Sequence, residues 1–259
     1  MLVFIICLGL SVGSFINVAY RRFSPSLSHV AYLQAISVKR SKCLNCGSTL
    51  ALWQLIPVIS WLILKGRCYY CHCKISLHYP VLELLLATLF TLIYIDRGLN
   101  SHSLLMMMLS GFFILLALID FKYYLLPDLF TQPFMWLGLI ASYFELTSVN
   151  LNDAFLGILL GYGLLKIPAT LFFCIFKKTG LGGGDIKLLA AFGAWLPYYL
   201  LPWLVVIACL LGIIYYLCLR YLLAKHQVRL IPFAPFLSLS GYCLSYFCKE
   251  LSEIPYVLV

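Results

Sequence analysis

The sequence predicts an all-α polytopic membrane protein with about eight transmembrane helices and a small cytoplasmic zinc-ribbon-like insert. Of the 259 residues, 63% are hydrophobic and only 10% are charged, whereas soluble domains carry about 25% charged residues. The hydrophobic residues gather in runs close to the roughly 20 residues that cross a bilayer. Basic residues collect between alternate runs, as they do in the cytoplasmic loops of membrane proteins.

Eight apolar runs are the expected spans. They cover residues 2–20, 79–95, 102–119, 129–147, 154–176, 187–200, 203–219 and 231–248. The interruption WLPYYLLPW at 195–203 is short, so a count of seven spans is the alternative. The expected organisation is a first transmembrane helix at 1–20, a cytoplasmic segment at 21–78 and a transmembrane core at 79–259.

The positions of the Lys and Arg residues predict the side of the membrane on which each loop lies, because short basic loops stay in the cytoplasm. If residues 21–78 are cytoplasmic, alternation of the spans puts fifteen of the 18 basic residues on that side. They are Arg21, Arg22, Lys39, Arg40, Lys42, Lys65, Arg67, Lys74, Lys122, Lys177, Lys178, Lys187, Arg220, Lys225 and Arg229. Both termini then lie outside the cytoplasm. Charges spread over several loops form no basic stripe, so no nucleic-acid partner is expected from the net charge of +9.

The expected cytoplasmic segment contains two CxxC pairs that predict a zinc site. CLNC supplies Cys43 and Cys46, and CYYC supplies Cys68 and Cys71, with 21 residues between the pairs. Each pair offers two thiolates from one tight turn, and four thiolates complete a tetrahedral site. Thiols stay reduced in the cytoplasm, which favours a structural Zn²⁺ over two disulfides or redox dithiols. Cys73 is an alternative ligand to Cys71, which the CxxC spacing favours.

Two aspartates stand at the ends of expected spans on the same side. Asp120 ends the third span in LLALIDFKYYLLPD, and Asp185 begins the sixth in GLGGGDIKLL. Free N–H groups and the helix dipole stabilise an Asp in a first turn, so a helix-start role is the alternative for Asp185 and for Asp128. Asp120 lies at a helix C-terminus, where the dipole disfavours an anion by about 0.3–1 kcal/mol. Its position indicates another use.

Two carboxyl groups at matched depth can act as an aspartic protease pair. When they lie close together they cannot both ionise, so one keeps a proton while the other takes one from a bridging water. We expect Gly182, Gly183 and Gly184 to adopt positive φ and to admit an extended substrate, with Gly182 and Gly184 as substrate contacts. Lys122 and Lys187 are expected to reach lipid phosphate and to leave the acids unneutralised.

Glu83 lies within the second expected span, in PVLELL. An ionisable group in a bilayer is costly, so a function is the default hypothesis. One interpretation is a contact to a basic residue of a substrate. The alternative is an interhelical hydrogen bond made by a protonated Glu83.

An ordered set of motifs resembles the type IV prepilin peptidases, bacterial inner-membrane aspartic proteases of the GxGD type that also N-methylate their product. The motifs are GSFINVAYRR, the two CxxC pairs, RCYYC running on to HYPVLELLLATLF, LIDFKYYLLPDLFTQPFMWLGL, GLGGGDIKLLAAFGAW and IPFAPFLSLSG. They occur in this order between residue 11 and about residue 241. The GxGD element alone is a weak signal, whereas the ordered set is specific.

The resemblance implies that Asp120 and Asp185 form the catalytic pair and that Asp128, of the LPD element, is not the second catalytic acid. It implies that the substrates are prepilins or type II secretion pseudopilins, cleaved after a glycine at the cytoplasmic face of the inner membrane. The new N-terminal residue would then be methylated with S-adenosylmethionine. His72 departs from the family pattern, because a glycine commonly follows the second CxxC pair, and Ala234 gives IPFAP in place of IPFGP.

Two other functions fit parts of the sequence. A membrane dithiol oxidoreductase would use the CxxC pairs as redox centres, but the charge distribution puts them in the reducing cytoplasm. An ion-coupled transporter would need acids near the bilayer midplane, whereas Asp120 and Asp185 lie at span ends. A nucleotide loop at GLGGGD lacks the preceding strand of a βαβ unit.

Overall fold

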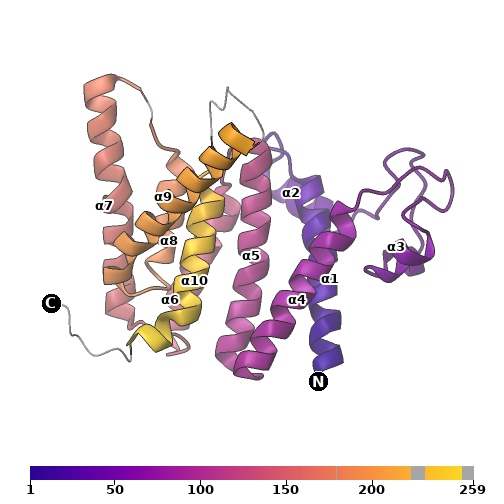
Figure 1. Ribbon diagram of the computed structural model, residues 1–259, viewed down its shortest axis with the longest axis horizontal. Helices are drawn as coiled ribbons and strands as arrows, with labels where there is room; N and C mark the ends of the chain where they lie inside the picture. The colour runs from indigo at the N-terminus through magenta and orange to yellow at the C-terminus, as the bar shows by residue number, and fades with distance from the viewer. Residues whose placement is uncertain (179, 223–230, 253–259) are drawn as a thin grey trace. The chain divides into compact units, whose positions relative to one another are not determined.

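Helices form the regular structure in the part of the chain that is described. The computed structural model describes residues 1–178, 180–222 and 231–252, and these residues form ten α-helices and no β-strand (Figure 1). The predicted all-α fold class is confirmed. Lys225 and Arg229, which contributed to the predicted orientation, lie outside the described residues.

The chain divides into two compact units, Met1–Leu115 and Leu116–Val259. The boundary falls within α5 (Ser101–Tyr123). This helix therefore contributes its first four turns to one unit and its last turns, with Asp120, to the other.

Five helical stretches are long and apolar enough to cross a membrane, as expected of a polytopic membrane protein. They are α1 (Leu2–Arg22), α4 (His78–Arg97), α5, α7 (Leu151–Phe176) and the stretch Tyr198–Tyr221, which contains α9 (Leu201–Leu217). Each corresponds to one of the eight expected spans.

The other three expected spans are also helical, although they are not among these five. They are α6 (Asp128–Tyr143), α8 (Gly183–Phe192) and α10 (Ala234–Ser252). The ten residues of α8 extend only about 15 Å, half of the hydrocarbon layer. The apolar run was expected to be helical to residue 200, but the helix ends at Phe192. Hydropathy reports burial inside the protein as well as in lipid, and residues 193–196, which follow the helix, are buried in the protein.

Small residues bring α1 and α4 into close contact in the first unit. A Cβ added at Gly9 or at Gly13 would lie 2.6 Å from a Cα atom of α4. The four-residue spacing puts both glycines on one helix face, the small-xxx-small pattern of membrane helix pairs. One turn further, the side-chain amide of Asn17 donates a hydrogen bond to the carbonyl of Tyr79 at 3.2 Å.

The segment between α1 and α4 holds short helices and two tight loops. The helices are α2 (His29–Ser37), the 3₁₀ turn η1 (Leu52–Leu55) and α3 (Ile59–Ile63). Two isolated antiparallel bridges, Lys42 with Thr49 and Arg67 with Lys74, close the loops that carry the CxxC pairs.

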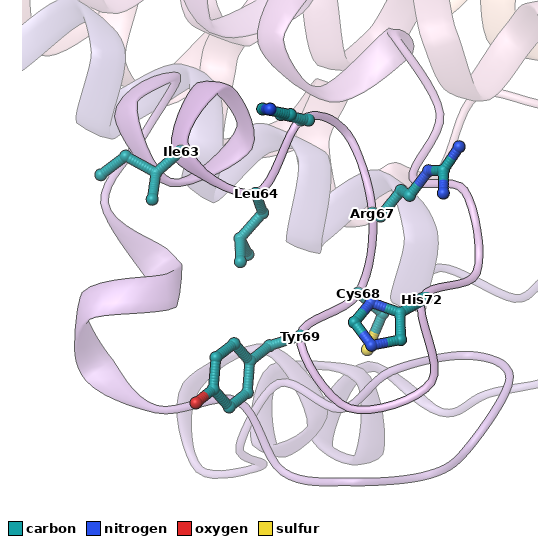
Figure 2. A pocket seen from close by; sticks show the side chains of 7 residues that line it. Ile63, Leu64, Arg67, Cys68, Tyr69 and His72 are labelled. Atoms are coloured by element: carbon teal, nitrogen blue, oxygen red, sulfur yellow. The ribbon is translucent and has the colours of Figure 1, made fainter.

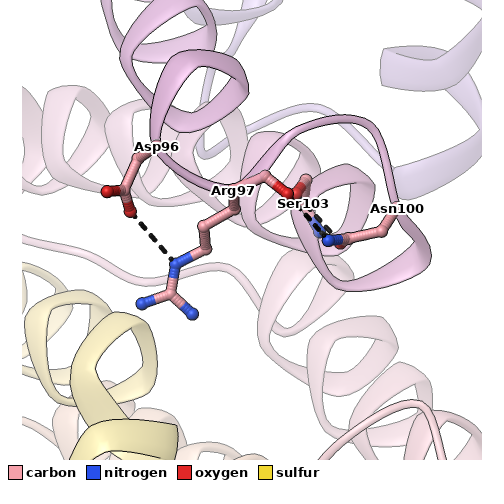
Figure 3. Close-up of polar contacts among 4 residues, drawn as sticks. All are labelled: Asp96, Arg97, Asn100 and Ser103. Atoms are coloured by element: carbon pink, nitrogen blue, oxygen red, sulfur yellow. Dashed lines mark hydrogen bonds and ion pairs between the residues drawn. The ribbon is translucent and has the colours of Figure 1, made fainter.

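A tight turn joins α4 to α5 within the first unit (Figure 3). The side-chain oxygen of Asn100 accepts hydrogen bonds from the backbone N–H of Ser103 at 2.7 Å and from its hydroxyl at 2.9 Å. Nε of Arg97 lies 3.4 Å from the carboxylate of Asp96 at the end of α4. Asn is a favoured N-cap residue, so these bonds fix where α5 begins.

The helix α8 forms a buried centre in the second unit. It packs against α6, α7 and α10, and most of its side chains from Ile186 to Phe192 are buried. The ring of Phe134 in α6 stacks on Trp195 with centroids 5.4 Å apart, and the indole N–H of Trp195 donates to the carbonyl of Phe134 at 2.9 Å. Because α8 is held on several sides, its first turn, with Asp185, has a defined position.

Candidate functional site

Asp120 lies in the last turn of α5, and only 5% of the residue is exposed. Its Oδ2 accepts a hydrogen bond from the backbone N–H of Ala234, the first residue of α10, at 3.2 Å. A helix N-terminus offers free N–H groups and the positive end of the helix dipole, and both stabilise a carboxylate. The start of α10 therefore compensates for the position of Asp120 at the C-terminal end of its own helix.

Asp185 lies in the first turn of α8, outside the five membrane-crossing stretches, and is half-buried. Burial raises the pKa of Asp185 to about 7, and the negative charge of Asp120 acts in the same direction. The second unit thus brings the two predicted acids close enough to interact electrostatically. A pair of this kind favours the state in which one carboxyl is protonated and the other is ionised.

The glycines at the start of α8 have different surroundings. A Cβ added at Gly184 would lie 2.7 Å from the Cβ of Leu126, and one at Gly182 would lie 3.0 Å from Oδ2 of Asp185, whereas Gly183 has nothing within 4 Å. None of the three has a positive φ, so that expectation is wrong. Gly184 is needed for close packing, and Gly182 leaves room beside the carboxylate.

Lys187 pairs with Asp128. Its Nζ lies 2.7 Å from Oδ1 and 2.8 Å from Oδ2 of that carboxylate. Asp128 is the first residue of α6, in agreement with a helix-start role, and the ion pair ties α6 to α8. The expectation that Lys187 leaves Asp185 unneutralised holds, but this carboxylate takes the place of the expected lipid phosphate. Nζ of Lys122 lies 4.7 Å from the centre of the Tyr123 ring.

Glu83 is buried in α4, with 6% of the residue exposed. Its Oε2 accepts a hydrogen bond from the backbone N–H of Val58 at 2.7 Å. Val58 has φ of 57°, which is unusual for a β-branched residue. Glu83 therefore holds the backbone of the segment that precedes α3.

The four predicted metal ligands come together in the first unit. The Sγ atoms of Cys43, Cys46, Cys68 and Cys71 all lie within 4.8 Å of one another, and all four are free thiols. Those of Cys43 and Cys71 are 3.8 Å apart. Zn–S bonds of about 2.3 Å in a tetrahedron separate the sulfur atoms by about 3.8 Å. The donor set and its spacing fit a Zn²⁺ ion.

Cys73 lies close to this cluster, with its Sγ 3.7 Å from that of Cys43. Hydrogen bonding distinguishes it from Cys71. The backbone N–H of Cys73 lowers the pKa of Cys71 to about 6, whereas the hydrogen bond with Cys71 raises the pKa of Cys73 to about 12. Metal ions bind thiolates, so the lower pKa favours Cys71 over Cys73 as the ligand.

His72 keeps the shape of the second knuckle although a glycine is common there. Gly47 follows the first CxxC pair with φ of 71°, and His72 follows the second with φ of 53°. Their backbone N–H groups donate equivalent hydrogen bonds of 3.0 Å to the carbonyls of Cys43 and Cys68. Both knuckles therefore have the same turn.

Two contacts of the site were not predicted from the sequence: the bond from Ala234 to Asp120 and the pair of Lys187 with Asp128. Each joins residues far apart in the chain, and neither leaves a periodic pattern. The one available signal was IPFAP, because Pro235 is a residue that favours the first turn of a helix.

Comparison with known proteins places the chain in one family. Residues 7–97 match the bacterial peptidase A24 N-terminal domain, and residues 107–217 match the type IV leader peptidase family. A protein of Escherichia coli named type 4 prepilin-like proteins leader peptide-processing enzyme is 35% identical over 92% of this chain and 91% of its own length.

Proteins named prepilin leader peptidase/N-methyltransferase are similar over comparable lengths. The one from Neisseria gonorrhoeae is 35% identical over 92% of this chain and 87% of its own. The one from Pseudomonas aeruginosa is 33% identical over 93% and 89%. No solved structure matches the chain. With the two acids brought together and these relatives covering nearly its whole length, the chain belongs to the type IV leader peptidase family.

Proposed function

We propose that this chain is an intramembrane aspartic endopeptidase that removes the leader of prepilins or pseudopilins and N-methylates the new N-terminal residue. The observation that carries the proposal is the electrostatic proximity of Asp120 and Asp185 within one compact unit. The names of the relatives, prepilin leader peptidase/N-methyltransferase, support both activities.

In the proposed reaction the acid pair holds a water molecule. Asp120, which accepts a hydrogen bond from the N–H of Ala234, is the ionised member, and Asp185 carries the proton. Asp120 takes a proton from the water as the water oxygen bonds to the carbonyl carbon of the peptide, and Asp185 gives its proton to the carbonyl oxygen. The intermediate then collapses. One hydroxyl returns a proton to Asp185, the C–N bond breaks, and the leaving amine takes the proton from Asp120.

Space for the substrate lies beside the glycines that precede Asp185. Gly182 is exposed and adjoins the Asp185 carboxylate, so an extended peptide can approach there. Gly184 contributes to the same surface by allowing close packing on Leu126. Glu83 is a further candidate for contact with a basic leader residue. S-adenosylmethionine supplies the methyl group that the new amine receives.

We place the acid pair at the cytoplasmic face of a bacterial inner membrane, with residues 21–78 in the cytoplasm. The concentration of basic residues on that side supports this orientation. A structural Zn²⁺ held by Cys43, Cys46, Cys68 and Cys71 would join the two knuckles of the cytoplasmic segment.

The competing functions receive less support. Four thiols gathered at the spacing of a tetrahedral metal site suit zinc better than a pair of dithiol redox centres. Asp120 and Asp185 lie at helix ends and interact electrostatically, which suits a hydrolytic pair, whereas a transporter needs an ion path through the midplane.

The test uses the full chain reconstituted in lipid and a peptide with a prepilin leader. Mass analysis of the product detects cleavage and the mass of one added methyl group. Asp120→Asn and Asp185→Asn should each abolish cleavage, because an Asn and an Asp cannot hold and exchange a shared proton as two carboxyl groups do. Asp153→Asn, which changes an acid at the start of α7, is the matched control and should cleave normally. Full cleavage by either variant of the pair would refute the assignment.

A further inference from the structure

The first unit exposes apolar side chains outside its membrane-crossing helices. Residues 50–64 read LALWQLIPVISWLIL and include only two polar side chains, Gln54 and Ser60. The turn η1 and the helix α3 lie in this stretch, and α3 has no buried residue. The exposed side chains of residues 50–64 include Leu52, Leu55, Ile56, Ile59, Leu62 and Ile63. A contiguous apolar patch of this kind marks a contact surface.

The charge around this stretch has one sign. Residues 1–82 contain no Asp or Glu. The basic side chains exposed in the segment that carries η1 and α3 are Lys39, Arg40, Lys42, Lys65, Arg67 and Lys74. Polybasic segments next to membrane helices are attracted to anionic lipid head groups. The charge therefore complements an anionic lipid surface.

A hydrogen bond sets the depth of the stretch. Val58, just before α3, donates its N–H to Glu83, five residues after α4 begins at His78. At 1.5 Å per residue, this contact lies about 7.5 Å along the helix. Near the helix start, the guanidinium of Arg21 lies over the ring of Tyr79, a pairing of residue types typical of the membrane interface. Interfacial helices bury their apolar face by about 5–10 Å, so the depth agrees.

A cavity of about 500 Å³ adjoins α3 on its basic side (Figure 2). Ile63 and Leu64 line its apolar part, and Lys65, Arg67 and His72 line its basic part. In the figure, Leu64 points toward the Tyr69 ring. An apolar wall next to cationic groups suits a phospholipid, whose acyl chain and phosphate need these two environments.

We propose that η1 and α3 form an interfacial anchor that enters the lipid leaflet beside α4, with Lys65 and Arg67 against anionic phospholipid head groups. A run of 15 residues is too short to cross the bilayer and has the length of an interfacial segment. The anchor holds the cluster of Cys43, Cys46, Cys68 and Cys71 at the membrane surface, because α3 and the second CxxC pair are separated by only four residues.

The test measures amide hydrogen exchange of residues 59–64 in the full chain. The chain is placed in nanodiscs of phosphatidylcholine, in nanodiscs that also contain phosphatidylglycerol, and in detergent. Exchange should be slower in both bilayers than expected for exposed amides. It should slow by a further factor of about five or more with phosphatidylglycerol, since one basic residue near an anionic surface contributes about that factor. Equal rates in the two bilayers would overturn the role of Lys65 and Arg67, and unprotected amides in both would overturn the anchor.

Two double variants each remove two basic charges, at different places in the chain. Lys65→Gln with Arg67→Gln should remove the effect of phosphatidylglycerol, whereas Lys177→Gln with Lys178→Gln, exposed after α7, should keep it. A photoreactive residue at Leu62 gives a direct reading of contact. Adducts with lipid support the anchor, and adducts with protein alone would overturn it.

Discussion

Lys187 and Asp128 form a two-point ion pair, with Nζ 2.7 Å and 2.8 Å from the two carboxylate oxygens. The pair joins the beginning of α6 to α8, two residues beyond Asp185. Both side chains are partly exposed, so the pair contributes at most about 1 kcal/mol to stability. Its larger effect is on position, because it holds the lysine on Asp128 and ties the start of α8 to α6.

We expect Lys187→Met to lower kcat for leader cleavage by about tenfold with little change in thermal stability, since a small displacement of a catalytic group is costly. Asp128→Asn should have a similar effect. Because the two residues act through one contact, the double variant should be no worse than either single one. Steady-state kinetics of the three variants checks this, and multiplicative losses would contradict the coupling.

Cleavage should fall as the pH rises above about 7. The raised pKa of Asp185 means that this carboxyl keeps its proton up to about that pH and loses it above. At higher pH both acids are ionised, and the proton needed by the carbonyl oxygen is absent. The alkaline side of the kcat/KM profile should therefore drop about tenfold per pH unit. Helix content measured by circular dichroism at each pH is the control, and an unchanged rate from pH 6 to pH 9 would contradict the assignment.

Gly184→Ala and Gly183→Ala should behave differently although they are neighbours. The new methyl group at residue 184 would lie 2.7 Å from the Cβ of Leu126, whereas at residue 183 it would meet nothing within 4 Å. Overpacking of this kind costs about 1–3 kcal/mol. Gly184→Ala should thus lower the melting temperature and reduce cleavage, while Gly183→Ala should retain both. Equal stability of the two variants would show that the packing around Leu126 can accommodate the added methyl group.

Cys71→Ser and Cys73→Ser are a second matched pair. If Cys71 is the fourth ligand, its loss should lower the bound zinc and weaken the remainder of the site, and loss of Cys73 should leave one zinc per chain. Metal analysis of the purified proteins measures this directly. Zinc retained by Cys71→Ser and lost from Cys73→Ser would exchange the two assignments. His72→Gly should keep the metal, because the turn already has the conformation that glycine prefers.

The sequence predicted the helices because each apolar run is long and is bounded by charged or turn residues. It also predicted that Asp120 and Asp185 act together, since both stand at span ends on one side. The length of α8 was missed for a physical reason. An apolar residue such as Leu196 gives the same hydropathy whether lipid or protein surrounds it, and here protein does.

The support of the site could not be predicted because it comes from backbone groups and long-range pairs. The hydrogen bond that Asp120 accepts comes from the backbone N–H of Ala234, whose side chain has no part in it. Likewise, the spacing of Gly9 and Gly13 suggests a close helix pair but does not identify α4 as the partner. The grouping of the four cysteines was easier to predict, because ligand type and CxxC spacing together indicate a tetrahedral site.

The bond from Ala234 to Asp120 also bears on how much polypeptide a working peptidase needs. The family match ends at residue 217, and a truncation there would keep both acids. It would nevertheless remove the amide that stabilises Asp120 and leave that charge facing the unfavourable pole of its own helix. The shortest N-terminal part of this chain that keeps the bond to Asp120 therefore extends beyond the family match to the start of α10.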